Sequence, residues 1–155
     1  MAKYAINNSL AGSQQNMTSS YKTAVSVFAG STARRGKIYD VLIGTDGTPA
    51  DNAVDWDISR MTVDGTGSAA TPQALDPADA AMAGTSKVNY TAEPTVTAAS
   101  SLFLVGVNQR ASYRWVAAPG SELVYPALAN NGLVLRAKSG GYTSTFTGAV
   151  LAEEQ

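Results

Sequence analysis

The chain has 155 residues, of which 11 are basic and 12 acidic, a formal net charge of −1, and neither histidine nor cysteine. It therefore lacks the usual proton shuttle of neutral pH, the thiolate nucleophile, the disulfide and the thiolate zinc site. Charged residues make up 15% of the chain, against roughly 25% in typical globular domains. This depletion fits a surface that packs against other proteins, and it equally fits a β domain that is rich in Thr and Ser. We expect neither an export signal nor a membrane-spanning segment.

Residues 1–20 are expected to form a loose N-terminal arm, and residues 21–155 a single folded domain. Within the arm, Lys3–Asn7 has the length of a short strand, whereas the polar stretch 8–16 has neither helical nor strand periodicity. From Tyr21 to Phe28 the two faces alternate, which predicts a strand.

The segment Lys37–Ile43 is rich in branched and aromatic residues and is apolar on nearly both faces, which predicts an inner strand. A cluster of turn residues follows over 44–52. The next strand shows a clean alternation, with one predicted buried face and one predicted solvent face: Val54, Trp56 and Ile58 against Asp55, Asp57 and Ser59.

Residues 63–72 are a connection rich in Gly, Thr, Ser and Ala; its Gly65-Thr66-Gly67 lacks the third glycine of a phosphate-binding loop and is expected to be flexible. A short helix is predicted over about 76–84. Asp76 suits its N-cap, Pro77 its first turn and Gly84 its end.

Further strands are predicted near residues 101–107, 112–117, 122–125, 133–137 and 142–153. The chain then has about eight or nine strands, one short helix and no alternation of strands with helices. This pattern predicts an all-β fold, an antiparallel β-sandwich, and the strand number suits a jelly roll best.

Two groups of acidic residues are candidate sites. Asp55 and Asp57 project from one strand face about 7 Å apart, and paired carboxylates can hydrolyse glycosides. The alternation of the strand already explains them as its solvent face. The loop 46–52 offers oxygen ligands for calcium but lacks the regular spacing of a calcium loop, so a turn held by its own Asp and Asn side chains is favoured.

Polar groups stand beside aromatic residues at Asn108, Gln109 and Arg110, and again at Arg114 and Trp115. A carbohydrate or nucleic-acid surface uses that combination. The alternative interpretation is a core tryptophan with an arginine on the outer face of its strand.

One basic cluster is visible, Arg34, Arg35 and Lys37. Three charges are too few to predict phosphate-backbone binding, and protection of a strand edge or a salt bridge to a partner is favoured. We expect no catalytic, cofactor-binding or metal-binding residue.

Several stretches within residues 21–153, in their residue pattern and their order along the chain, resemble small virion proteins of tailed bacteriophages. These stretches are Gly36–Gly44, Ala53–Arg60, Ala74–Asp79, Asn108–Trp115 and Ala117–Leu123. Members of this group are similar to jelly-roll capsid decoration, or cement, proteins, which sit as trimers on icosahedral heads.

The resemblance implies a non-enzymatic structural protein of the outer capsid surface, made in the cytoplasm of the bacterial host. Its implied partners are the major capsid protein and two further copies of itself in a homotrimer, with no cofactor, nucleic acid or membrane. One rival is a trimeric fibre or baseplate module that binds host glycans through exposed Trp or Tyr with Asn108 and Gln109. A second rival is a glycosidase built on Asp55 and Asp57.

Overall fold

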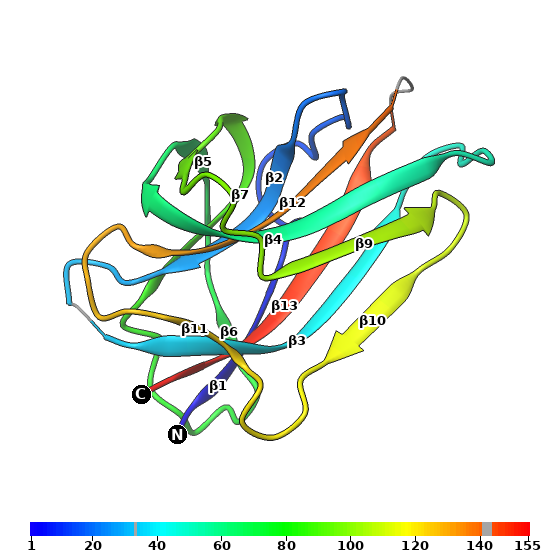
Figure 1. Ribbon diagram of the computed structural model, residues 1–155. Helices are drawn as coiled ribbons and strands as arrows, with labels where there is room; N and C mark the ends of the chain where they lie inside the picture. Colours follow the sequence, from blue (N-terminus) through cyan, green and yellow to red (C-terminus); the bar gives the residue numbers. More distant parts are fainter. Residues whose placement is uncertain (33, 141–143) are drawn as a thin grey trace.

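The computed structural model describes residues 1–32, 34–140 and 144–155, which form two antiparallel β-sheets (Figure 1). The predicted all-β fold and the β-sandwich are confirmed. No described segment forms a helix that is long and apolar enough to cross a membrane. The described residues contain thirteen strands rather than eight or nine, because several short strands extend the edges of the two sheets.

Sheet A has the strand order β10-β3-β13-β1-β6, and β11 pairs with β3 beside β10. Its strands are β1 (Lys3–Asn7), β3 (Gly36–Thr45), β6 (Gln73–Ala74), β10 (Tyr113–Val116), β11 (Leu123–Tyr125) and β13 (Phe146–Glu154). The predicted inner strand is confirmed, since β3 lies between β13 on one side and β10 and β11 on the other.

Sheet B has the strand order β5-β7-β2-β12-β4-β8, and β9 also pairs with β4. Its strands are β2 (Lys22–Phe28), β4 (Ala53–Val63), β5 (Thr66–Ala70), β7 (Thr85–Ala92), β8 (Thr95–Val96), β9 (Phe103–Asn108) and β12 (Gly132–Ser139). The first four strands alternate between the two sheets, so each chain crossing closes one end of the sandwich.

The core fills the space between the sheets. Trp56 on β4 and Phe146 on β13 meet there edge to face, with ring centroids 5.8 Å apart, and both side chains are fully buried. The predicted inward face of β4 is confirmed, because Val54 and Ile58 are buried beside Trp56 in the same cluster. Burial of such large apolar side chains is the main favourable term in folding.

The helix predicted over 76–84 is absent, because the backbone groups that would build it bond elsewhere. In a helix the Gly84 amide would donate to the Ala80 carbonyl. Instead the Ala80 carbonyl accepts a hydrogen bond from the Tyr4 hydroxyl (2.8 Å), and the Gly84 amide donates to the Glu154 carboxylate (2.6 Å). The segment is a series of turns.

The arm predicted over residues 1–20 is not loose throughout, although residues 9–15 have no regular secondary structure, as expected. Lys3–Asn7 forms the predicted strand, β1, but that strand lies inside sheet A between β13 and β6. Asn8 is buried and its side-chain amide donates to the Phe146 carbonyl (2.9 Å), while Met17 is part of the core. The pairing partner β13 is at the far end of the chain, so local sequence patterns gave no sign of it.

Strand β7 was not predicted, because its alternation is interrupted. Asn89 has a φ of 51°, in the left-handed region that non-glycine residues seldom adopt. Its side-chain amide donates to the carbonyls of Asn8 and Ala11, each at 2.7 Å. β7 thus fastens the first turn of the chain to sheet B. The expected connection over 63–72 likewise contains a strand, β5.

Candidate functional site

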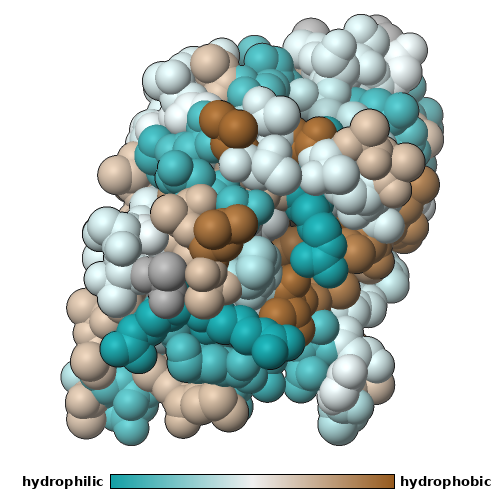
Figure 2. All heavy atoms as spheres, turned by 60° about the vertical axis from the view of Figure 1, so that its left-hand side comes forward, coloured by the Kyte–Doolittle hydropathy of each residue, from teal (hydrophilic) through white to brown (hydrophobic). Residues whose placement is uncertain are grey.

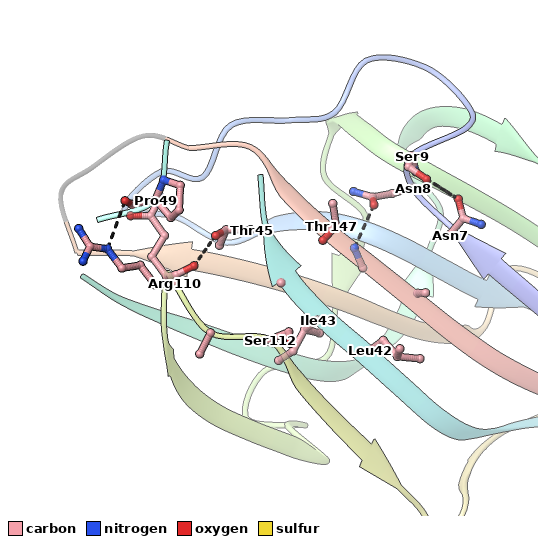
Figure 3. A pocket seen from close by; sticks show the side chains of 15 residues that line it. Asn7, Asn8, Ser9, Leu42, Ile43, Thr45, Pro49, Arg110, Ser112 and Thr147 are labelled. Atoms are coloured by element: carbon pink, nitrogen blue, oxygen red, sulfur yellow. Dashed lines mark hydrogen bonds between the residues drawn. The ribbon is translucent and has the colours of Figure 1, made fainter. Parts of the chain in front are cut away.

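A groove of about 480 Å³ lies on the outer face of sheet A, beside the loops that follow β3 and β9 (Figure 3). Its floor comes from the outward residues of β3 and β13, because the residues between them point into the core. Pro49 and Arg110 stand at one end of the groove, and Asn7 and Ser9 at the other.

Small side chains make this face concave. Gly44 on β3 lies opposite Thr147 on β13, and Leu42 lies opposite Ala149. A Cβ at Gly44 would lie 3.3 Å from Oγ1 of Thr147, a tight contact, so a larger side chain at this position would crowd Thr147 on the floor. Alternation indicates which residues of these strands face outward, but no signal in the sequence indicated that the floor would be hollow.

The Arg110 end of the groove is held by its own loops. Nε of Arg110 donates to the Pro49 carbonyl (3.4 Å), and Nη1 lies 3.5 Å from a carboxylate oxygen of Asp51. Gln109 is buried, and its side-chain carbonyl accepts a hydrogen bond from the Ala50 amide (2.8 Å). Contacts between the two loops therefore restrict the Arg110 side chain before any partner binds. This lowers the conformational entropy that Arg110 would lose on binding.

The polar and aromatic residues predicted to act together are separated in the structure. Gln109 and Arg110 line the groove, and the Asn108 side chain accepts a hydrogen bond from the Arg110 amide (2.9 Å). Trp115 instead faces the interior, where its ring centroid lies 5.8 Å from that of Phe103. The interpretation of Trp115 as a core residue is the better one, since it packs against the core.

Asp55 and Asp57 lie on the outer face of sheet B, but the predicted solvent face of β4 holds only for Asp55, because Asp57 and Ser59 are both buried. The Asp57 side chain is 2% exposed and accepts a hydrogen bond from Nε of Arg136 (2.5 Å), whereas Asp55 is 51% exposed and pairs with Lys138 (3.8 Å). The Tyr21 ring lies 4.3 Å from the Arg136 guanidinium and covers this pair. Both carboxylates thus join β4 to β12.

The loop 46–52 behaves as the predicted turn. A side-chain oxygen of Asp46 accepts a hydrogen bond from the Gly47 amide (2.7 Å), and Asp51 is the partner of Arg110. Within 1–32, 34–140 and 144–155, no three acidic side chains are grouped closely enough to hold a metal ion.

The basic cluster is divided between solvent and the fold. Arg34 and Arg35 are exposed, while Lys37 lies 3.6 Å from Glu122 and 3.5 Å from Glu153. Hydrogen bonding to its own backbone and the charge of Lys37 lower the pKa of the Glu122 carboxyl. The Lys37 charge is therefore used within the chain.

Apolar side chains border the groove on the β10 side. Leu42 and Val116 are exposed on the outer face of sheet A, where Arg114 pairs directly with Leu42 and Val116 pairs with Asp40. On the face turned forward in Figure 2, hydrophilic side chains form several patches with pale and apolar side chains between them. Such a surface suits contact with another protein.

Compared with known proteins, the chain matches no family model, no curated protein and no solved structure. The candidate site is a shallow, nearly neutral groove with two anchored polar ends and an apolar border.

Proposed function

We propose that this protein is a capsid decoration, or cement, protein of a tailed bacteriophage that binds the outside of the assembled head. The observation that carries the proposal is the groove face of sheet A. It combines a floor of small side chains with the exposed Leu42 and Val116 and with arginines that are already held in place. Aromatic residues and arginine are enriched, and other charged residues depleted, in the cores of protein interfaces.

We further infer that the two sheets have jelly-roll topology. Eight strands, taken in chain order as β1, β2, β3, β4, β9, β10, β12 and β13, supply the pattern. Numbered one to eight in this order, the strands lie side by side as 1-8-3-6 in sheet A (β1-β13-β3-β10) and as 2-7-4-5 in sheet B (β2-β12-β4-β9). This neighbour order supports a jelly roll of about eight strands in two Greek keys, with β5 to β8 and β11 as additional strands.

In this account the major capsid protein is the partner, and the protein acts as a homotrimer on the outer capsid surface after synthesis in the bacterial cytoplasm. Three copies that engage neighbouring capsid subunits gain affinity from effective concentration, even when each contact is weak. Binding to the assembled shell but not to free subunits stabilises the shell by mass action. No catalytic step enters the account, since Asp55 and Asp57 each have a cationic partner.

A binding experiment with heads that lack the protein tests the proposal. Wild-type protein should co-sediment with assembled heads and leave unassembled capsid subunits in the supernatant. Ala149→Lys places a charged chain on the groove floor and should weaken binding at least tenfold. Ala92→Lys, an exposed alanine in β7 of the other sheet, should bind like wild type. Absence of wild-type binding to heads would overturn the proposal.

The rival glycan-binding module keeps one supporting observation. Arg110, Ser112 and Asn7 line a groove of about 480 Å³, within the range of roughly 300–1,000 Å³ for small-ligand sites. Against it, Trp56 is fully buried and Trp115 packs against the core, so neither offers an open ring face for a sugar. Competition of head binding by soluble host glycans would favour this rival.

A further inference from the structure

We infer that the open flank of the sandwich, at the free edges of β9 and β10, is a contact surface for a second copy of this chain. The flank consists of six apolar residues: Leu102, Phe103, Leu104, Tyr113, Trp115 and Val116. The inference deepens the proposed function by naming the interface between subunits, and it rests on the part of that proposal that makes the protein an oligomer.

The first observation is the free backbone of β10, which pairs only with β3 among the described strands. The Ala117 amide, just beyond the strand, donates to the Tyr39 carbonyl of β3 (2.9 Å). Hydrogen-bonding direction alternates along a strand. Arg114 and Val116 therefore turn their N–H and C=O groups toward the open side.

β9 presents a second free edge next to it. It pairs with β4, and the Gln109 amide that follows it donates to the Asn52 carbonyl on that side (2.8 Å). By the same alternation, Leu104 and Gly106 turn their backbone groups away from β4. In Figure 1 the chain turns directly from β9 into β10, so both free edges belong to one side of the molecule.

Aromatic rings join the two edges across the gap between the sheets. Phe103 on β9 lies 6.2 Å from Tyr113 and 5.8 Å from Trp115, both on β10, measured between ring centroids. Beside them Leu104 is 64% and Val116 56% exposed. Leu104 lies on the outer side of β9 and Val116 on the outer side of β10, so exposed apolar side chains accompany both free edges.

The flank also lacks the usual protection of an edge. Sheet edges are commonly guarded by Lys, Pro or very short strands. β6 and β8 are only two residues long, and Pro94 immediately precedes β8. β9 and β10 contain neither Lys nor Pro, and Arg114 is their one charged residue.

Charge complementarity favours a second copy as the occupant. Residues 101–121 contain two charged side chains, Arg110 and Arg114, and each has an acidic partner in the same chain, Asp51 and Asp40. Two copies can therefore approach without repulsion between like charges. A charged partner would lose hydration here without gaining an ion pair. A second copy is also present as soon as the chain is made.

The test compares oligomeric state by sedimentation velocity across a range of concentrations. The flank variant carries Leu102→Lys with Leu104→Lys, two exposed flank residues that lie outside the groove face, and the control carries Leu75→Lys with Leu128→Lys. The control leucines are 51% and 58% exposed and lie in turns outside the flank. Wild type and control should be oligomers, and the flank variant a monomer that retains its circular dichroism spectrum. A wild-type monomer, or a flank variant with the wild-type mass, would overturn the inference.

Amide hydrogen exchange on the wild-type protein gives an answer even where the flank variant fails to fold. In the oligomer, the amides of Arg114 and Val116 should exchange at least tenfold more slowly than in dilute monomer. Unchanged exchange at both amides, under conditions in which the oligomer forms, would place the interface elsewhere.

The inference and the proposed function can fail separately. If the wild-type protein is an oligomer that dissociates on flank substitution but does not bind heads, the flank interface is supported and the decoration role is contradicted. If the wild-type protein is a monomer that binds heads, the decoration role is supported and the flank interface is contradicted.

Discussion

The guanidinium of Arg114, an exposed side chain, is held in place by the buried carboxylate of Asp40. Nε of Arg114 lies 3.0 and 3.2 Å from the two carboxylate oxygens, and Nη2 makes a third hydrogen bond to Asp40. The Arg114 side chain is 61% exposed and that of Asp40 3%. These bonds raise the pKa of Arg114 and fasten the edge strand β10 to β3.

Removing one partner of this pair should cost more stability than removing both. Arg114→Met leaves the Asp40 carboxylate buried without its partner, which is unfavourable. Arg114→Met combined with Asp40→Leu leaves no unpaired charge, so the double variant should recover most of the loss. Urea unfolding of wild type, single and double variants measures this. A double variant less stable than the single one would show that the pair itself stabilises the sheet.

Two buried tyrosines should respond in opposite ways to loss of their hydroxyl. The Tyr90 hydroxyl is hydrogen-bonded to Ser26 (2.6 Å) and Asp64 (2.9 Å), so Tyr90→Phe should destabilise the protein by about 1–3 kcal/mol. The buried Tyr125 hydroxyl has no hydrogen-bond partner among the residues that the structure describes. Tyr125→Phe should therefore be neutral or stabilising. Chemical unfolding of the matched pair checks the order, and equal losses would contradict it.

The same tyrosines predict loss of stability at alkaline pH. Burial raises the pKa of Tyr90 and of Tyr125 above the ordinary tyrosine value of about 10. The folded protein therefore holds protons that the unfolded chain releases. Their contribution to stability is complete below about pH 10 and falls as pH rises toward the folded-state pKa values. Spectroscopic titration should show these two phenols ionising together with unfolding; ionisation in the folded protein would contradict the burial argument.

Glu154 should control the turn over residues 76–84. Its carboxylate accepts hydrogen bonds from the amides of Ala83 (2.9 Å) and Gly84 (2.6 Å). Glu154→Ala should cost about 1 kcal/mol and speed hydrogen exchange at both amides, whereas Glu154→Gln keeps one acceptor and should have a smaller effect. Unchanged exchange in Glu154→Ala would show that other contacts hold the turn.

Sequence patterns predicted what depends on neighbours along the chain. The alternation of Val54, Trp56 and Ile58 correctly predicted one face of β4. The opposite face was less predictable, because Asp57 is covered by Arg136 from a strand almost eighty residues away. The predicted helix over 76–84 failed for a similar reason, since Tyr4 and Glu154 bind its backbone.

The candidate site was only partly predictable. Arg110 attracted attention by its sequence neighbours, and it does line the groove. Gly44 and Thr147 carried no signal of their own, because the hollow between them depends on the register of β3 against β13. Strand register over such separations is set by the whole sheet.

The most direct test of the decoration role is the copy number of this chain relative to the major capsid protein in purified virus particles. Quantitative mass spectrometry of intact particles measures it. The account predicts a ratio near one to one, or another ratio fixed by icosahedral symmetry. A few copies per particle would place the protein at a vertex, neck or tail, and absence from particles would remove it from the virion; either result would contradict a cement role.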